Sequence, residues 1–116
     1  MAINVKVTIT IGTRYGKCAG SDYGKIAPVE DIQWARRWIP RDTATIVGGA
    51  TFTEGTGVWY DDNNQPVEET VLTVVAYTTN EKVYLLRHLV ALHWKKYFQQ
   101  DAVLFVVEPV LDIEFV

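Results

Sequence analysis

The stretch INVKVTITI, residues 3–11, decides the fold class of this chain. Its apolar residues Val5, Val7, Ile9 and Ile11 alternate strictly with asparagine, lysine and threonine. A period of two places the apolar side chains on one face of a β-strand and the polar side chains on the other. β-Branched residues dominate the stretch, as the pleated surface of a sheet prefers. We therefore expect a sheet with one face packed on a core.

Patterns that follow this strand predict two helices and three further strands. The first helix begins near Pro28 with acidic residues in its first turn, and Pro40 is expected to end it. The second helix is expected to be capped by Asn80. A turn-rich segment, 61–66, joins two strands into a hairpin. The expected order is strand 3–11, helix 28–40, strand 43–53 continued by 57–60, strand 67–77, helix 81–98 and strand 102–107.

This order, β-α-β-β-α-β, is that of the ferredoxin-like fold. It predicts an α+β two-layer sandwich, in which two helices cover one face of an antiparallel sheet. The tail alternates again, with Leu111, Ile113 and Phe115 on one side, and predicts an extra C-terminal strand at a sheet edge. Because no linker or repeat divides the chain, we expect residues 1–116 to form a single domain.

The composition argues against several classes of protein. The net charge is −3 and no basic stripe is present, so we expect no nucleic-acid partner. No apolar run reaches the roughly 20 residues of a membrane helix, and the N-terminus lacks a signal-peptide layout. The single cysteine, Cys18, fits a reducing compartment. We therefore expect a cytoplasmic protein with no membrane partner.

Neither a metal site nor a cofactor site is predicted. His88 and His93 are five residues apart on the predicted second helix, so they do not share one face of it. His93 falls near the apolar stripe and is expected as a hydrogen-bonded core histidine. No Rossmann fingerprint, CxxC pair or HExxH motif occurs.

Two of the predicted strands are apolar on both sides, which indicates self-association. Residues 71–76 and 102–107 contain almost no polar side chains. Exposing the second face to water would cost several kcal/mol at roughly 25 cal/mol per Å². A homodimer or higher homo-oligomer would bury this face against its own copy. The C-terminal tail, folded over the sheet, is the competing cover, and both arrangements are compatible with each other.

A glycine-rich loop, 12–25, follows the first strand and suggests a binding site. It departs from the P-loop because the spacing of its glycines is one residue short and Ile26 stands where Ser or Thr would hold magnesium. Its backbone amides, together with nearby cations, still suit an anion. We predict a small anionic ligand between this loop and the sheet. The predicted ligand-binding residues are Lys6, Arg14, Trp59 and Glu69.

Three functions follow from these features, and the residues leave all three open. The first is a non-enzymatic, homo-oligomeric binding protein, which would suit a small phage-encoded protein that sequesters a host molecule. The second is a cofactor-free enzyme of the dimeric α+β barrel type, with Glu69 or His88 as the base. The third is a protein–protein interaction module that uses Trp34 and Trp38. We favour the first, because no catalytic motif is present.

Several short motifs also resemble those of a known family. They are the apolar strand ending in Gly12, Trp34 after an acidic helix start, Ala44-Thr45-Ile46-Val47, Gly57-Val58-Trp59-Tyr60-Asp61, Glu69-Thr70-Val71-Leu72, and the stretch from Tyr97 to Leu104. In these the chain resembles a family of small bacterial domains of unknown function. The resemblance implies the same ferredoxin-like fold and no established activity.

Overall fold

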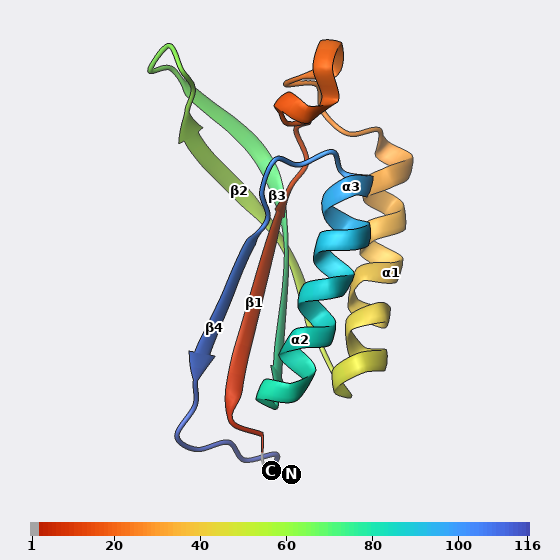
Figure 1. The fold of residues 1–116 in the computed structure, drawn as a ribbon, viewed down its shortest axis with the longest axis vertical. Helices are drawn as coiled ribbons and strands as arrows, with labels where there is room; N and C mark the ends of the chain where they lie inside the picture. Colours follow the sequence, from red (N-terminus) through yellow and green to blue (C-terminus); the bar gives the residue numbers. More distant parts are fainter. Residues whose placement is uncertain (1–2) are drawn as a thin grey trace.

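The structure, a computed structural model, describes residues 3–116 and has the predicted two-layer architecture (Figure 1). Its four-stranded antiparallel sheet has the order β2-β3-β1-β4, and the helices cover one face. The elements are β1 (Val5–Gly12), the 3-10 helix η1 (Lys17–Asp22), α1 (Val29–Val47), β2 (Thr51–Tyr60), β3 (Pro66–Thr78), α2 (Asn80–Leu89), the π-helical turn η2 (Val90–Trp94), α3 (Lys95–Tyr97) and β4 (Leu104–Pro109). The ferredoxin-like α+β fold is confirmed.

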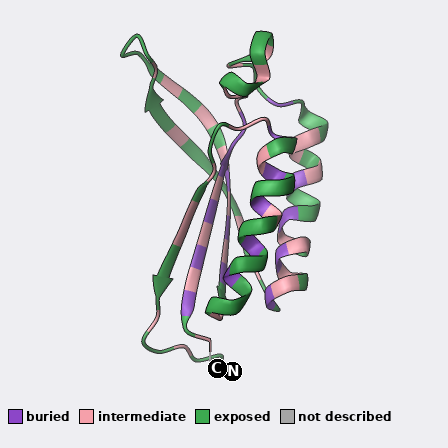
Figure 2. Cartoon of the chain, in the orientation of Figure 1, coloured by how far each residue is buried: buried purple, intermediate pink, exposed green. Residues whose placement is uncertain are grey.

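The core lies between the inner face of the sheet and the helices, where the buried residues gather (Figure 2). The apolar residues of β1 are buried, as their alternation predicted. They pack with the inner residues of β3 and with Trp94 and Phe98, the two largest fully buried side chains. Each large apolar side chain in this core stabilises the fold by about 1.5–3 kcal/mol.

The first helix continues through Pro40, so the predicted end at this residue was wrong. α1 runs to Val47, and Gly48 caps it with a φ of 95° and a bond from its N–H to the carbonyl oxygen of Ala44, at 2.7 Å. Proline inside a helix costs about 3 kcal/mol. The turns beyond it bury Thr43 and Val47, and this packing offsets the cost. The strand predicted over 43–53 therefore begins only at Thr51.

The second helical stretch contains a π-turn that shifts its buried face. Thr79, not the predicted Asn80, occupies the N-cap position. A π-turn holds one residue more than an α-turn, so the face toward the core moves by one position after η2. Phe98 is therefore buried, whereas Tyr97 is 39% exposed. His93 lies on the exposed side, and its predicted place in the core was wrong.

The tail after Pro109 forms no strand, so the predicted C-terminal strand was also wrong. Within residues 110–116 the only backbone bond outside regular elements runs from the Val110 N–H to the Asn4 carbonyl oxygen, at 2.9 Å. Leu111, Phe115 and Val116 are almost fully exposed. An alternating pattern describes which face a strand would present, but it does not supply a neighbouring strand with free hydrogen-bonding groups.

The outer face of the sheet is left without helices (Figure 1). On it, β3 and β4 place half-buried or exposed apolar side chains, namely Val71, Val75, Leu104 and Val106. A polar centre separates them, where the hydroxyl oxygens of Thr10 and Thr73 lie 3.2 Å apart. Phe115 of the tail lines a hollow with Val75 and Tyr77 at one end of this face, whereas Leu111 and Val116 are fully exposed, so apolar area such as that of Leu104 remains available.

Replacement of Pro40 should raise the stability of the protein. Pro40→Ala restores the N–H that α1 lacks at this position, and we expect the free energy of unfolding to increase by about 1–3 kcal/mol. Urea unfolding followed by circular dichroism measures the change. Arg41→Ala, at the next and exposed position, is the control and should shift it by less than about 0.5 kcal/mol. A loss of stability in Pro40→Ala would contradict a helix that continues past this residue.

Gly48 and Gly49 provide a matched pair that tests where α1 ends. A Cβ atom at either residue meets nothing within 4 Å, but only Gly48 has a positive φ, of 95°. Gly48→Ala should therefore lower the free energy of unfolding by about 1 kcal/mol, since the left-handed conformation strains a side chain. Gly49→Ala should leave it unchanged or slightly higher. Thermal unfolding distinguishes the two, and equal effects would argue against the observed cap.

Candidate ligand-binding site

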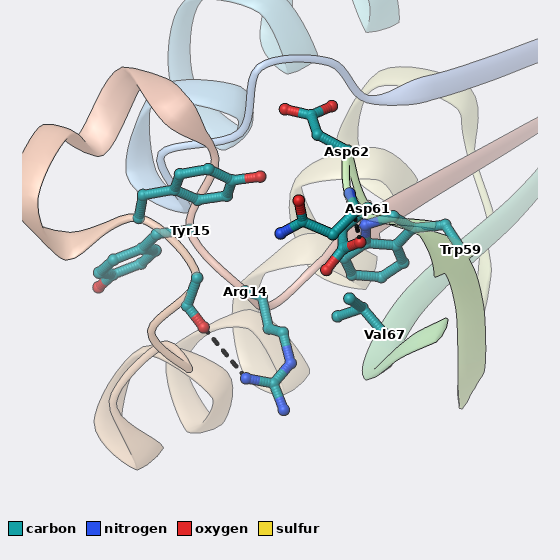
Figure 3. Close-up of a pocket in the computed structure, with 9 residues that line it drawn as sticks. Arg14, Tyr15, Trp59, Asp61, Asp62 and Val67 are labelled. Atoms are coloured by element: carbon teal, nitrogen blue, oxygen red, sulfur yellow. Dashed lines mark hydrogen bonds between the residues drawn. The ribbon is translucent and has the colours of Figure 1, made fainter. Parts of the chain in front are cut away.

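A cleft of about 420 Å³ opens where the loop after β1 meets the β2–β3 hairpin (Figure 3). The loop contributes Arg14, Tyr15 and Tyr23, and the hairpin contributes Trp59 and Val67. The volume falls within the range of small-molecule sites, which is about 300–1,000 Å³. Aromatic rings and a cation therefore line a space in which a small molecule fits.

Backbone hydrogen bonds join the two ends of the glycine-rich loop 12–25 and order it. The Tyr15 N–H donates to the Lys25 carbonyl oxygen, and the Gly24 N–H donates to the Tyr15 carbonyl oxygen, both at 2.8 Å. The Ala27 N–H in turn donates to the Thr13 carbonyl oxygen at 2.7 Å. These bonds fold the two ends of the loop against each other and hold Tyr15 at the edge of the cleft.

Asp101 fixes the far end of the same loop. Its carboxylate accepts hydrogen bonds from the backbone N–H groups of Lys17, at 2.7 Å, and Cys18, at 2.9 Å. The N–H bonds from Cys18 and Lys17 lower the pKa of the Asp101 carboxyl. Gly16 is required here, because a Cβ atom on it would lie 2.7 Å from the Asp101 carboxyl carbon. η1 is thereby attached to the connection that leads from α3 to β4.

The guanidinium of Arg14 keeps its positive charge available to the cleft. Its Nε donates to the Glu68 carbonyl oxygen at 2.8 Å. Its Nη1 donates to the Gly24 carbonyl oxygen at 3.0 Å, as Figure 3 shows. Both acceptors are neutral carbonyl groups, and no carboxylate within residues 3–116 forms an ion pair with this side chain. The two carbonyl groups therefore position the side chain, and the Glu69 carboxylate interacts with its charge without forming an ion pair.

The acidic residues on the opposite wall are already engaged. Asp61 Oδ1 accepts the N–H groups of Asn63 and Gln65, both at 2.9 Å, and so shapes the hairpin turn. Asp62 pairs with Lys17 Nζ at 2.9 Å across the cleft mouth. Arg14 is therefore the cation of the cleft without an ion-pair partner within the described residues, and Asp61 keeps its negative charge on the opposite wall.

Glu69 connects the end of β1 to β3 beside the cleft. Its Oε2 accepts the backbone N–H groups of Thr13, at 3.0 Å, and Arg14, at 2.7 Å. Burial raises the pKa of the Glu69 carboxyl, against the opposing effect of these two N–H bonds and of the Arg14 charge. A side chain on Gly12 would overlap this carboxylate. Glu69 therefore acts mainly through the position that it gives to Arg14.

The four predicted ligand-binding residues do not all come together. Arg14 and Trp59 line the cleft, and Glu69 lines an adjoining cavity of about 300 Å³ that Arg14 shares. Lys6 lies toward the opposite end of β1, paired with Tyr77 and Glu108. The strand direction separates Lys6 from Arg14 by eight residues of nearly extended chain, about 26 Å.

The sequence analysis missed Tyr15 and Tyr23, which complete the aromatic wall. Both lie among the glycines of the loop 12–25, so the available signal was the pairing of rings with glycines in that loop. It also missed Gln100, whose Nε2 donates to the Arg14 carbonyl oxygen at 2.7 Å and to the Phe98 carbonyl oxygen at 3.0 Å. Gln100 lies 86 residues from Arg14 in the chain, a contact that no local pattern encodes.

The remaining candidate groups lie away from the cleft. His88 packs edge-on against Tyr84 on α2, with ring centroids 4.4 Å apart, and it is not brought near Glu69. Cys18 is exposed, and burial and the Asp101 hydrogen bond raise the pKa of its thiol, which disfavours the thiolate. In the described part of the chain no three histidine, cysteine or acidic side chains cluster as metal ligands would.

The two tryptophans of the predicted interaction module present their rings differently. Trp34 stacks on Tyr97, with ring centroids 4.4 Å apart, and Tyr97 donates to Asp31 Oδ1 at 2.8 Å. Trp38 is 40% exposed and lies under the Arg37 guanidinium.

Across residues 3–116, no helix combines the length and the apolar character that a membrane span requires.

Several solved structures are similar to this chain. A phage SAM lyase in complex with S-methyl-5'-thioadenosine matches with a TM-score of 0.62 and 16% identity, covering 94% of this chain and 83% of the lyase. The divalent ion tolerance protein CutA1 from Ehrlichia chaffeensis matches with a TM-score of 0.59 and 12% identity, covering 98% of this chain and 88% of that protein. The divalent cation tolerance protein from Thermus thermophilus matches with a TM-score of 0.59 and 13% identity, covering 97% of this chain and 88% of that protein. At these identities the likeness shows a shared fold.

The sequence comparisons point to one family. No curated protein matches the chain. The family model described as "Protein of unknown function (DUF3574)" matches residues 18–115, which include most of η1, the helices and the hairpin. The chain belongs to this DUF3574 family of proteins of unknown function.

Proposed function

We propose that this chain is a homo-oligomeric binding protein that holds a small anionic ligand with a flat ring in the cleft between the loop 13–24 and the β2–β3 hairpin. The observation that carries this proposal is the Arg14 guanidinium, which is fixed by two neutral carbonyl groups and has no carboxylate partner within residues 3–116, beside an aromatic wall. An unpaired cation next to exposed rings suits a ligand that has an anionic group and a ring.

The aromatic wall supports a ring-bearing ligand. Trp59 is 39% exposed and Tyr23 is 52% exposed, although both belong to a cleft that could bury them. A ring placed between the loop and the hairpin would remove apolar area of both residues from water. The phage lyase with the similar fold was solved with a thionucleoside, which supports purine nucleosides and nucleotides as the first probes.

The charge of Arg14 supports an anionic group on that ligand. The free Nη2 and the outer edge of the guanidinium remain for a carboxylate or phosphate oxygen, and a charge-assisted bond contributes about 1.5–3 kcal/mol. The neighbouring Lys17 is already paired with Asp62. Arg14 is therefore the group expected to distinguish a charged ligand from its neutral analogue.

Titration with three probes tests the ligand class. Isothermal titration calorimetry should show adenosine monophosphate binding about 10-fold or more tightly than adenosine and S-methyl-5'-thioadenosine, because one charge-assisted bond to Arg14 is added. Arg14→Ala should abolish this difference, and Arg14→Lys should keep part of it. Lys25→Ala is the matched control, since Lys25 is a cation of the same loop that pairs with Asp22 outside the cleft.

Thermal unfolding of each variant accompanies this titration, because Arg14 also bonds two backbone carbonyl groups of the site. Trp59→Ala should weaken all three probes, whereas Trp59→Phe should largely retain them. Equal affinity of the wild-type protein for charged and neutral probes, with Arg14→Ala folded and unchanged in binding, would contradict an anion site.

The outer face of the sheet supports a second copy of the chain as the partner. Its apolar side chains Val71, Leu104 and Val106 remain half-buried or exposed, and Lys6, paired with Glu108, lies near one end of the face. Two copies that face each other with antiparallel strands would bury these apolar side chains against one another and would exchange the ends of the sheet. This arrangement also gives Lys6 a place near the partner's site.

The molar mass in solution tests this partner. Light scattering after size-exclusion chromatography should give a multiple of the 13.1 kDa chain mass for the wild-type protein. Val106→Lys places a charge on the outer face and should yield the monomer, whereas Tyr84→Lys, on the exposed side of α2, should leave the mass unchanged. A wild-type protein that is monomeric at all concentrations would contradict the oligomer.

A further inference from the structure

Two side-chain oxygens converge over Gly12, at the end of β1 that leads into the glycine-rich loop. A Cβ atom added to Gly12 would lie within 2.7 Å of both Glu69 Oε1 and Gln100 Oε1, so the two oxygens are less than twice that distance apart. Gly12 is buried, whereas the other residues on its face of β1 are half-buried. A carboxylate from β3 and an amide from the connection to β4 therefore meet at one spot on the sheet.

Hydrogen bonds to the other atom of each group fix the orientation of both oxygens. Glu69 Oε2 accepts the backbone N–H groups of Thr13 and Arg14. Gln100 Nε2 donates to the carbonyl oxygens of Arg14 and Phe98. Because two acceptors surround this nitrogen, the amide of Gln100 cannot be reversed. The two Oε1 atoms are consequently held toward the same point.

Neither Oε1 atom has a hydrogen-bond donor or a salt-bridge partner within residues 3–116. Both side chains are half-buried, and the fully buried side-chain atoms without a partner in this part of the chain are Thr79 Oγ1 and Trp94 Nε1 instead. Water therefore reaches both oxygens. Burial raises the pKa of the Glu69 carboxyl, so a positively charged donor at Oε1 would stabilise its ionised form.

The chemistry of the two oxygens favours a primary ammonium group. Both atoms only accept, one of them carries negative charge, and an ammonium group has three N–H donors. A nitrogen about 2.7–2.9 Å from each oxygen, the usual length of such bonds, can bridge any separation that this geometry allows. A calcium ion would need about six to eight oxygen ligands. A water molecule would leave the negative charge uncompensated.

We propose that Glu69 Oε1 and Gln100 Oε1 together bind the primary ammonium group of a small amine. The carboxylate supplies the opposite charge, and the fixed amide oxygen supplies direction. The guanidinium of Arg14 takes no part, because its bonds run to the carbonyl oxygens of Glu68 and Gly24. This site is therefore separate from the anion proposed for the cleft, and either proposal can fail without the other.

Nuclear magnetic resonance tests the proposal with methylammonium chloride as the probe. In a ¹H–¹⁵N spectrum, methylammonium should saturably shift the backbone N–H signals of Thr13 and Arg14 and the side-chain NH₂ signals of Gln100, because these groups are bonded to the two side chains that bind it. Tetramethylammonium carries the same charge but has no N–H donor, so it should shift them much less at equal ionic strength. Potassium chloride is the second control.

Glu69→Gln removes the proposed site while keeping the hydrogen bonds that order the loop. The new amide oxygen must accept the N–H groups of Thr13 and Arg14, so the NH₂ group takes the place of Oε1 and faces Gln100 Oε1. Methylammonium should then bind about tenfold or more weakly, since a donor replaces a charged acceptor. The melting temperature should be unchanged or higher, because the NH₂ group gains an acceptor.

Glu68→Gln is the matched control, since it neutralises the adjacent and exposed carboxylate, and it should change the affinity by less than about twofold. Equal shifts with methylammonium and tetramethylammonium, the same response to potassium, or undiminished binding by folded Glu69→Gln would overturn the proposal. Should Glu69→Gln not fold, the wild-type comparison of the two ammonium ions decides by itself.

Discussion

The carboxylate of Glu69 is the interaction on which the arrangement of the candidate site depends. The ladder between β1 and β3 ends at the pair Gly12 and Val71. Beyond it, the N–H groups of Thr13 and Arg14 lack strand partners, and Glu69 Oε2 accepts both. Burying a carboxylate is costly, and here two backbone donors offset part of the cost, because burial still raises the pKa of the Glu69 carboxyl. The direction of the chain after β1 is therefore fixed, and so is the position of the Arg14 backbone.

The rest of the site follows from this fixed exit. Thr13 Oγ1 donates to the Thr70 carbonyl oxygen at 2.6 Å, and Gln100 holds the Arg14 carbonyl group. Asp101 then binds the start of η1. Each anchor is a side chain that replaces a missing strand neighbour, so the loop is ordered although it contains little regular structure. This order allows Arg14 to be held by carbonyl groups without an ion-pair partner within residues 3–116.

The fold leaves two surfaces for which it provides no cover of its own. One is the outer face of the sheet, where apolar side chains surround the Thr10–Thr73 contact. The other is the helical layer, where a hollow of about 440 Å³ lies between α1 and η2. Both arise because a two-layer sandwich buries only one side of each layer. Function in such a fold is consequently expected at the loop end of the sheet and on these outer surfaces.

The sequence by itself determined the class of fold, because the order of its elements and the alternation of apolar residues in β1 are local patterns. It also suggested Arg14, Trp59 and Glu69 as ligand-binding residues, and the structure places these three at one end of the sheet. Only the tertiary structure decided that α1 passes through Pro40, because the burial of Thr43 and Val47 against the sheet outweighs a local penalty. The tertiary structure also separated Lys6 from the cleft, because the direction of β1 carries the two apart. It brought Gln100 and Asp101 to the loop through long-range contacts, which no short sequence pattern encodes.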